Sequence, residues 1–307
     1  MGNELSHIPV LYQEVLAGLR IKPGGHYIDA TVGGGGHARG ILMASALDGK
    51  LLGIDADPMA IAVAREQLAE FGQRVTLVQG NFADLEEIAL RHGFYPLDGI
   101  FLDLGLSSMQ LEATERGFSL QLDGPLDMRF APSQMATAAD LVNTLSMEEL
   151  AGILSQYGEE PQARRIARAI VAERPINTTG ELAALVERTV GRRRRIHPAT
   201  RIFQALRIAV NNELECLAEA LPQALRLLAP GGRLVIISFH SLEDRLVKEF
   251  FRSEARDCLC PPKAPICTCG HRAALGIVTR KPIRPSADEV AANPRSRSAK
   301  LRIAYRL

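Results

Sequence analysis

Short apolar runs alternate with helical patterns through the first 110 residues, and this alternation constrains the fold more than any other feature of the chain. Strands are predicted at residues 27–31, 51–54, 75–78 and 100–104. Helices are predicted at residues 37–47 and 58–71, the second opened by Asp57-Pro58 as N-cap and first helical residue. Strands that alternate with helices predict an α/β fold, a parallel sheet with helices on both faces.

The alternation stops after Ser108, and the next stretch predicts helices only. Two capping boxes open helices there: Ser146 with Glu149, and Thr178 with Glu181. Further strands are predicted at residues 234–239, 277–280 and 300–305. We therefore expect an inserted, mostly helical domain at residues 110–200, flanked by two parts of the sheet domain, residues 1–109 and 201–307.

The composition is that of a soluble globular protein, with 47% hydrophobic and 23% charged residues. No run approaches the roughly 20 apolar residues that span a bilayer, and the first ten residues do not resemble a signal peptide. We therefore expect a cytoplasmic protein without a membrane partner. Five cysteines in 307 residues do not predict a disulfide scaffold.

Charge is distributed unevenly along the chain. Residues 111–160 carry a net charge of −7, whereas residues 161–207 carry +8 and residues 208–307 carry +6. Such asymmetry favours a polyanionic partner on the basic side, but an unevenly charged solvated surface has the same pattern.

A glycine cluster follows the first predicted strand, in the sequence DATVGGGGH of residues 29–37. Asp55 ends the second strand, where a carboxylate can accept hydrogen bonds from ribose hydroxyls. Glycine loop and acid together indicate an adenosine cofactor, and the loop also fits the loose dinucleotide fingerprint. There is no P-loop Lys-Ser/Thr, which argues against nucleotide hydrolysis. Phe82, after the third strand, either flanks an adenine or is a core aromatic.

The fourth strand leads into the sequence DLGLSSMQ, residues 103–110. Asp103 is expected at the carboxyl edge of the sheet, and Gly105 is expected to let the chain turn there. A carboxylate beside a bound methyl donor can hold an amine and receive its proton, which makes Asp103 the candidate catalytic residue. The alternative is that Asp103 caps a turn.

A basic segment predicts contact with a polyanion such as RNA, or else a solvated arginine face. It contains Arg192, Arg193, Arg194, Arg195, His197 and Arg201. Arg201, Gln204, Arg207 and Asn211 lie near one face of the same predicted helix. Arg164, Arg165 and Arg168 add charge on the preceding helical segment.

Two further features leave alternatives open. Cys258-x-Cys260 and Cys267-x-Cys269 either bind zinc or form a reduced loop braced by prolines. Structural zinc sites usually have two or more residues between paired cysteines, so no metal is expected. His240 follows the strand at residues 234–239 and either helps to place a target base or makes a structural hydrogen bond.

At these residues the chain closely resembles the bacterial 16S ribosomal RNA (cytosine-N4)-methyltransferase family of the MraW type. The resemblance covers nearly the whole chain. Its motifs are HIPVL (7–11), YIDATVGGGGH (27–37), GIDADP (53–58), DLGLSSMQ (103–110), ERGF (115–118), GPLDMR (124–129), YGE (157–159), HPATR (197–201), SFHSLEDR (238–245) and NPRSR (293–297).

The resemblance implies a Rossmann-like methyltransferase sheet with S-adenosylmethionine as cofactor, and methylation of a cytosine N4 in the decoding region of 16S ribosomal RNA, within the small subunit. The implied cofactor residues are Gly35, Gly36, His37, Asp55, Phe82, Asp103 and Gln110. Many other amino-methyltransferases have Asp/Asn/Ser-Pro-Pro-aromatic where this chain has Asp103-Leu-Gly-Leu. Asp103 is therefore either the amine acceptor or a residue that orients the cofactor.

Two other functions fit parts of the same pattern. A dinucleotide-dependent oxidoreductase would use the same glycine loop but would leave residues 103–110 and the basic insertion unexplained. A non-enzymatic RNA-binding protein of ribosome assembly would retain the pocket without turnover. The sequence does not determine the oligomeric state, and a homodimer is compatible with it.

Overall fold

The computed structural model describes residues 9–191, 197–261, 264 and 266–307. The chain divides into two compact units. The first unit comprises Met1–Gly105 and Glu215–Leu307, and the second comprises Leu106–Leu214.

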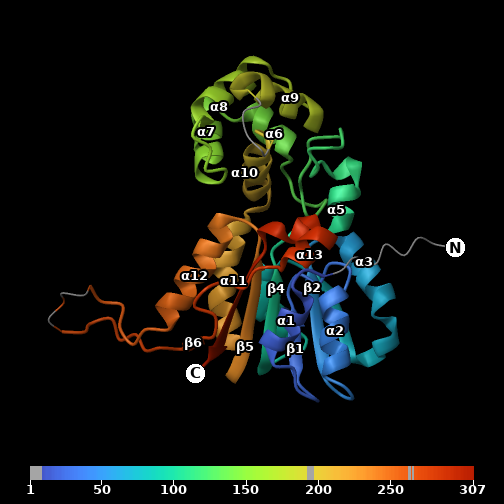
Figure 1. Cartoon of the computed structure of the whole chain (residues 1–307), viewed down its shortest axis with the longest axis vertical. Helices are drawn as coiled ribbons and strands as arrows, with labels where there is room; N and C mark the ends of the chain where they lie inside the picture. The colour runs from blue at the N-terminus through green and yellow to red at the C-terminus, as the bar shows by residue number, and fades with distance from the viewer. Residues whose placement is uncertain (1–8, 192–196, 262–263, 265) are drawn as a thin grey trace. The chain divides into compact units, whose positions relative to one another are not determined.

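The first unit contains a seven-stranded sheet of order β3-β2-β1-β4-β5-β7-β6 (Figure 1). Its strands are β1 (His26–Asp29), β2 (Lys50–Asp55), β3 (Val75–Gln79), β4 (Leu97–Asp103), β5 (Leu228–Ser238), β6 (Leu275–Ile277) and β7 (Lys300–Arg306). The neighbouring pairs among β1 to β5 are parallel, whereas β7 is antiparallel to both β5 and β6. The predicted parallel α/β sheet is thus confirmed.

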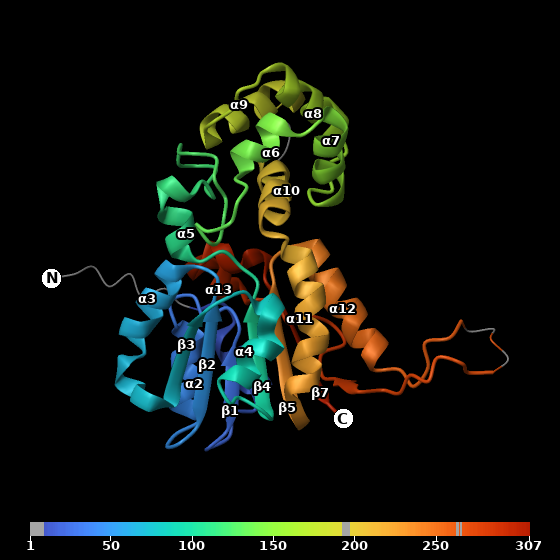
Figure 2. The same ribbon diagram turned by 180° about the vertical axis from the view of Figure 1, so that it is seen from behind.

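Helices cover both faces of this sheet. Those of the first unit are α1 (Tyr12–Leu19), α2 (Gly36–Ala44), α3 (Pro58–Gln67), α4 (Leu85–Arg91), α11 (Glu213–Leu227, its first two residues in the second unit), α12 (Ser241–Glu254) and α13 (Ala287–Ala292), with short 3-10 helices at Ala69–Arg74, Phe82–Asp84 and Pro294–Ser298. Helices α1, α2 and α3 contribute to one core cluster and α4, α11 and α12 to another. Figures 1 and 2 show these two sets on opposite faces of the sheet.

Alternating side chains of the strands supply the two core clusters. Tyr27 of β1 and Phe101 of β4 pack with α1, α2 and α3, whereas Ile28 and Ile100 pack with α4, α11 and α12. All four side chains are fully buried. A parallel strand covered on both faces is continuously apolar, which is why these runs stand out in the sequence.

The second unit is helical. Its elements are α5 (Ser108–Glu112), a 3-10 helix (Thr114–Arg116), α6 (Ala138–Thr144), α7 (Met147–Gln156), α8 (Ala163–Ala172), α9 (Thr179–Val190) and α10 (Thr200–Asn211). Ser146 and Thr178 cap α7 and α9 as predicted, each accepting the backbone N–H three residues later. No element of the described part of this unit is a strand.

The second unit ends later than the expected insertion, at Leu214 instead of residue 200. The difference is α10, which was expected in the sheet domain. Ile202, Phe203 and Leu206 of α10 are buried in one cluster with the apolar side chains of α7, α8 and α9. Shared burial therefore places α10 with the helices that precede it.

The predicted elements differ from the observed ones mainly at their ends. The strand expected at residues 277–280 is β6, which ends at Ile277, because the N–H groups of Val278 and Thr279 both point to the carbonyl of Ile303. Helix α2 ends at Ala44, and β4 begins at Leu97. In the described residues, no helix has both the length and the apolar character needed to cross a bilayer.

Candidate functional site

Three aspartates end three adjacent strands of the first unit. Asp29, Asp55 and Asp103 are the last residues of β1, β2 and β4, which run parallel with β1 in the middle. Their carboxyl groups therefore lie along one edge of the sheet. Burial raises the pKa of Asp29 to about 8, and the nearby charges of Asp103 and Asp55 act in the same direction. Burial also raises the pKa of Asp55 to about 6 and that of Asp103 to about 7.

The glycine loop lies between β1 and α2 and is tied to Asp55. Gly33 and Gly35 have φ of +51° and +87°, a backbone region that residues with a Cβ rarely adopt. The N–H of Gly33 donates to Asp55 Oδ2 at 2.9 Å, and the N–H of Asp57 donates to Asp55 Oδ1 at 2.9 Å. The backbone N–H of Ala56 also interacts with this carboxylate, and its roughly four acceptor positions still leave room for a hydroxyl group.

Gly36 has a different reason to be glycine. It opens α2, and a Cβ at this position would lie 2.7 Å from Cγ of Pro9. Gly36 is also required by packing within the protein.

Asp103 contacts the loop that follows β1 and lies near the start of α2. Its N–H donates to Thr31 Oγ1 at 2.6 Å, and its Oδ1 accepts the N–H of Gly105 at 3.4 Å. Its Oδ2 lies 4.0 Å from Nδ1 of His37. The Asp103 side chain remains 24% exposed, so its carboxyl group can be reached by a ligand.

His37 is held in place by contacts on both sides of its ring. Its Nε2 lies 3.0 Å from the carbonyl oxygen of Val10, and its ring packs 4.5 Å from that of Phe101. A carbonyl only accepts, so Nε2 carries a proton. In the neutral ring, Nδ1 is then an acceptor facing Asp103, which suits a carboxyl group whose pKa is raised.

Gly105 is required by packing and not by its φ, which lies outside the left-handed region. A Cβ there would lie 2.6 Å from the ring of Phe239, which follows β5. The sequence pattern suggested a sharp turn as the reason for this glycine. The close approach of Phe239 is the observed reason.

His240 caps α12. Its Nδ1 accepts the N–H of Glu243, while Glu243 Oε2 accepts the N–H of Phe239 at 2.8 Å and of His240 at 3.2 Å. Asp244, also in the first turn of α12, pairs with Arg302 and Lys300. Of the two alternatives, the structure places His240 in a structural hydrogen bond.

Phe82 lies after β3, as predicted, and is partly buried against the core cluster shared by α4 and α11. The preceding Asn81 caps its 3-10 helix by accepting the N–H of Ala83 at 2.9 Å. The N–H of Gly80 donates to the carbonyl of Asp55 at 2.9 Å. This bond joins the end of β3 to the end of β2.

The model of the MraW methylase family matches residues 4–307 of this chain. The chain belongs to the MraW methylase family. Ribosomal RNA small subunit methyltransferase H of Thermomicrobium roseum is 60% identical to it over 306 residues, covering 98% of this chain and 94% of the relative. The protein of the same name from Syntrophotalea carbinolica is 55% identical over 307 residues, covering 98% of each. A solved rRNA methylase from Streptococcus thermophilus covers 97% of this chain and 95% of its own, with 11% identity and a TM-score of 0.44, too weak a likeness to add to the assignment.

Other residues singled out in this MraW methylase sequence lie in the second unit. Gln110 is buried, and its Oε1 accepts the N–H of Ser107 at 3.1 Å in the capping box of α5. Nδ1 of His197 accepts the N–H of Ala199 at 3.2 Å. Arg201 donates to the carbonyl of Glu159 at 2.9 Å. Arg192, Arg193, Arg194 and Arg195 lie outside the described residues.

The polar side chains expected on one face of α10 make hydrogen bonds within the second unit. Gln204 donates to the carbonyl of Tyr157 at 3.0 Å, and Arg207 makes two hydrogen bonds of 2.7 Å to Glu213. Asn211 donates to the carbonyl of Met128 at 2.8 Å. These side chains join α10 to segments of its own unit. Arg164, Arg165 and Arg168 of α8 are exposed.

Sequence reasoning did not assign a role to Asp29 or Thr31. Asp29 is almost fully buried, and its Oδ1 accepts the N–H of Thr31 at 3.3 Å. Thr31 in turn accepts the N–H of Asp103. Asp29 could have been found from the sequence because it ends an apolar strand, as Asp55 and Asp103 do.

Proposed function

We propose that this chain is a methyltransferase that uses S-adenosylmethionine to methylate N4 of a cytosine in the decoding region of 16S ribosomal RNA. The observation that carries the proposal is the match of the MraW methylase family to residues 4–307. It is supported by relatives named ribosomal RNA small subunit methyltransferase H at 55–60% identity. The edge with Asp29, Asp55 and Asp103 is where open α/β sheets bind ligands.

The residues at this edge fit the cofactor. Asp55 would accept a hydrogen bond from the ribose hydroxyls, because the backbone N–H groups that it already binds leave part of its acceptor capacity unused. Gly33 and Gly35 would let the backbone approach the ligand closely. Gly36, His37, Phe82, Asp103 and Gln110 are the remaining proposed cofactor contacts. When bound, S-adenosylmethionine supplies a methyl group already activated on a sulfonium sulfur.

Asp103 is proposed as the residue that holds the target amine. As the bond from N4 to the methyl carbon forms, N4 must lose a proton, and the Asp103 carboxylate would receive it. Its pKa of about 7 means that the ionised and protonated forms are close in free energy at neutral pH. Positioning of the amine against the methyl group would supply much of the rate. The base would have to leave its stack to reach this edge.

The second unit is proposed to contact the RNA, within the small ribosomal subunit. Arg164, Arg165 and Arg168 of α8 are exposed, opposite a buried face that includes Ile166 and Ile170. Arg192, Arg193, Arg194 and Arg195 follow α9 in the sequence and add four positive charges. His197 and Arg201 of this unit and His240 of the first unit remain proposed RNA contacts, although each already makes a hydrogen bond within the protein.

Two measurements test this function against its alternatives. Isothermal calorimetry should show binding of S-adenosylhomocysteine and none of NAD, whereas the reverse result would favour an oxidoreductase. Small-subunit particles and free 16S RNA, each from a strain that lacks the modification, should then be incubated with the protein and labelled S-adenosylmethionine. Cofactor binding without transfer to either substrate would favour a non-enzymatic assembly protein.

A further inference from the structure

A segment of the first unit leaves the sheet between α12 and β6. Figures 1 and 2 show that the described residues of this segment, which spans 255–274, extend away from the body of its unit. None of its described residues is buried, and its large apolar side chains Leu259 and Ile266 are 43% and 75% exposed. The N–H of Ala274 nevertheless bonds to the carbonyl of Glu254 at 2.8 Å, which closes the base of the segment. A segment of this length without apolar burial needs another source of stability.

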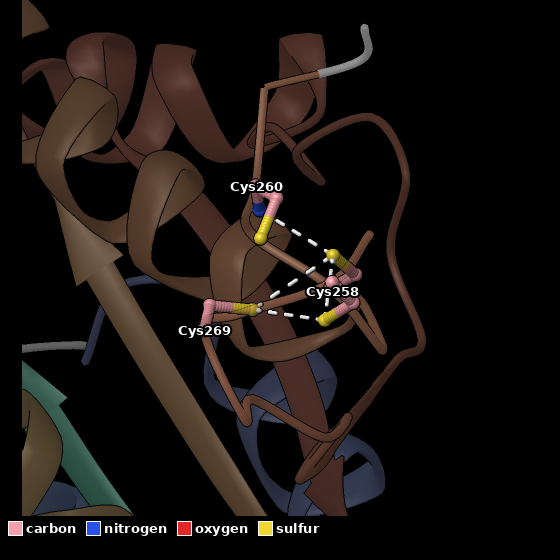
Figure 3. Close-up of side chains that lie close together, drawn as sticks. Cys258, Cys260 and Cys269 are labelled. Atoms are coloured by element: carbon pink, nitrogen blue, oxygen red, sulfur yellow. Dashed lines mark hydrogen bonds between the residues drawn. The ribbon is translucent and has the colours of Figure 1, made fainter. Parts of the chain in front are cut away.

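Four cysteine sulfurs converge inside this segment. The Sγ atoms of Cys258, Cys260, Cys267 and Cys269 all lie within 4.8 Å of one another. Cys258 and Cys267 are 3.4 Å apart, Cys267 and Cys269 are 3.6 Å apart, and Cys258 and Cys269 are 3.8 Å apart. All four thiols are free of disulfides. Figure 3 shows the sulfurs of Cys258, Cys260 and Cys269 directed toward one another.

These separations are those of a tetrahedral tetrathiolate. Zinc–sulfur bonds of about 2.3 Å place the four sulfurs about 3.8 Å apart. The pairs come from the two arms of the segment, so an ion at their centre would connect the arms. Four protein ligands would leave no open position on the ion, which is the arrangement of structural and not catalytic zinc.

Backbone groups around the cluster favour thiolates. The N–H of Cys260 points to Cys258 Sγ at 3.4 Å, that of Leu259 to Cys269 Sγ at 3.3 Å, and that of Thr268 to Cys260 Sγ at 3.4 Å. Hydrogen bonds of this kind stabilise the charged form of the acceptor. The thiolate is also the form that binds metal.

We propose that Cys258, Cys260, Cys267 and Cys269 bind one structural zinc ion that holds the 255–274 segment together. The one-residue spacing within each pair predicted no metal, but the convergence of the two pairs outweighs the spacing. Binding replaces four thiol protons with one zinc ion, so those protons are released to solvent. Soft thiolate ligands in tetrahedral geometry select zinc, with iron as the competing ion.

The test measures metal directly in the full-length protein, purified without chelators. Elemental analysis should give about one zinc per chain, and X-ray absorption should give four sulfur neighbours at about 2.3 Å. The Cys258→Ser/Cys269→Ser variant should lose the zinc. Cys216→Ser, which removes the only other cysteine, should keep it.

Hydrogen exchange shows whether a variant has lost its zinc because the whole protein unfolded. Removing zinc from the wild-type protein with a strong chelator should speed exchange in residues 255–274 and leave the sheet protected. Zinc well below one per chain with all five thiols titratable, iron in place of zinc, or two disulfides by mass would each overturn the proposal.

Discussion

The backbone N–H of Gly33 donates a 2.9 Å hydrogen bond to the Asp55 carboxylate, so the acid that ends β2 fixes the glycine loop that follows β1. The second oxygen of Asp55 accepts a hydrogen bond from the N–H of Asp57, which is the N-cap of α3. One carboxylate thereby sets the geometry of two neighbouring strand–helix connections. Its proposed contact with ribose would use the acceptor positions that remain.

Asp55→Ala should weaken cofactor binding. Hydrogen bonds to a charged group contribute roughly 1.5–3 kcal/mol each, so removing one or two hydrogen bonds to ribose should lower affinity about tenfold or more. Loosening of the glycine loop would weaken binding further. Calorimetry with S-adenosylhomocysteine measures the change, with Glu66→Ala as an exposed control on α3. Equal affinities in folded wild-type and Asp55→Ala proteins would remove Asp55 from the cofactor site.

Asp103→Asn should reduce methyl transfer far more than cofactor binding. A positioned general base contributes roughly 10²–10⁴-fold in rate, whereas the amide preserves the shape of the side chain. In the wild-type protein, the ionised carboxylate is the active form, so the single-turnover rate should rise with pH up to a pKa of about 7 and then level off. Single-turnover rates at saturating cofactor separate the roles. Weak cofactor binding with a normal rate and pH profile would mean that Asp103 only orients the cofactor.

Asp29→Asn should change how stability depends on pH. The pKa of Asp29 is about 8 in the folded chain and near 3.8 when exposed, so between these values the folded state retains a proton that the unfolded state has released. The free energy of unfolding should therefore fall as pH rises through this window, by up to about 1.4 kcal/mol per pH unit for this group. The amide should flatten the slope. Denaturant titrations from pH 5 to 8 measure it, with exposed Asp48→Asn as control. If the free energy of unfolding changed equally with pH in the wild-type and Asp29→Asn proteins, the raised pKa of Asp29 would be contradicted.

The strands, the capping boxes and the acids at the strand ends could be predicted because each depends on residues close together in sequence. The role of α10 could not. Its Gln204, Arg207 and Asn211 were expected to form a solvated or RNA-binding face, but their partners include Tyr157 and Met128, far away in the chain. The sequence pattern shows that a helix has a polar face and cannot show which distant carbonyl groups satisfy it.

The candidate site was partly predictable for the same reason. Asp55 and Asp103 stand out because each follows an apolar run, and Asp29 has the same pattern but is overshadowed by the glycines that follow it. The cap formed by His240 was missed because a ring nitrogen replaces the usual short oxygen side chain. Convergence of the four cysteines depends on how the 255–274 segment closes, which spacing alone does not determine.

Replacing arginines of the second unit should weaken RNA binding and leave cofactor affinity intact. Two variants test this: one with serine at positions 192–195, the other with serine at Arg164, Arg165 and Arg168. The slope of log affinity against log salt should become shallower by about 0.7–0.9 for each phosphate that the protein no longer neutralises. Arg252→Ser, an exposed arginine of α12, is the matched control. Salt slopes equal to wild type in both variants would mean that these arginines form only a solvated face.

Mass mapping of methylated nucleosides in 16S RNA, from cells with and without this protein, tests the proposed activity most directly. We expect a cytosine in the decoding region that carries an N4-methyl group only when the protein is present, and we expect the Asp103→Asn variant to fail to restore it. Identical N4-methylcytosine in both RNAs, or loss of a methyl group from a different base or atom, would contradict the proposed function.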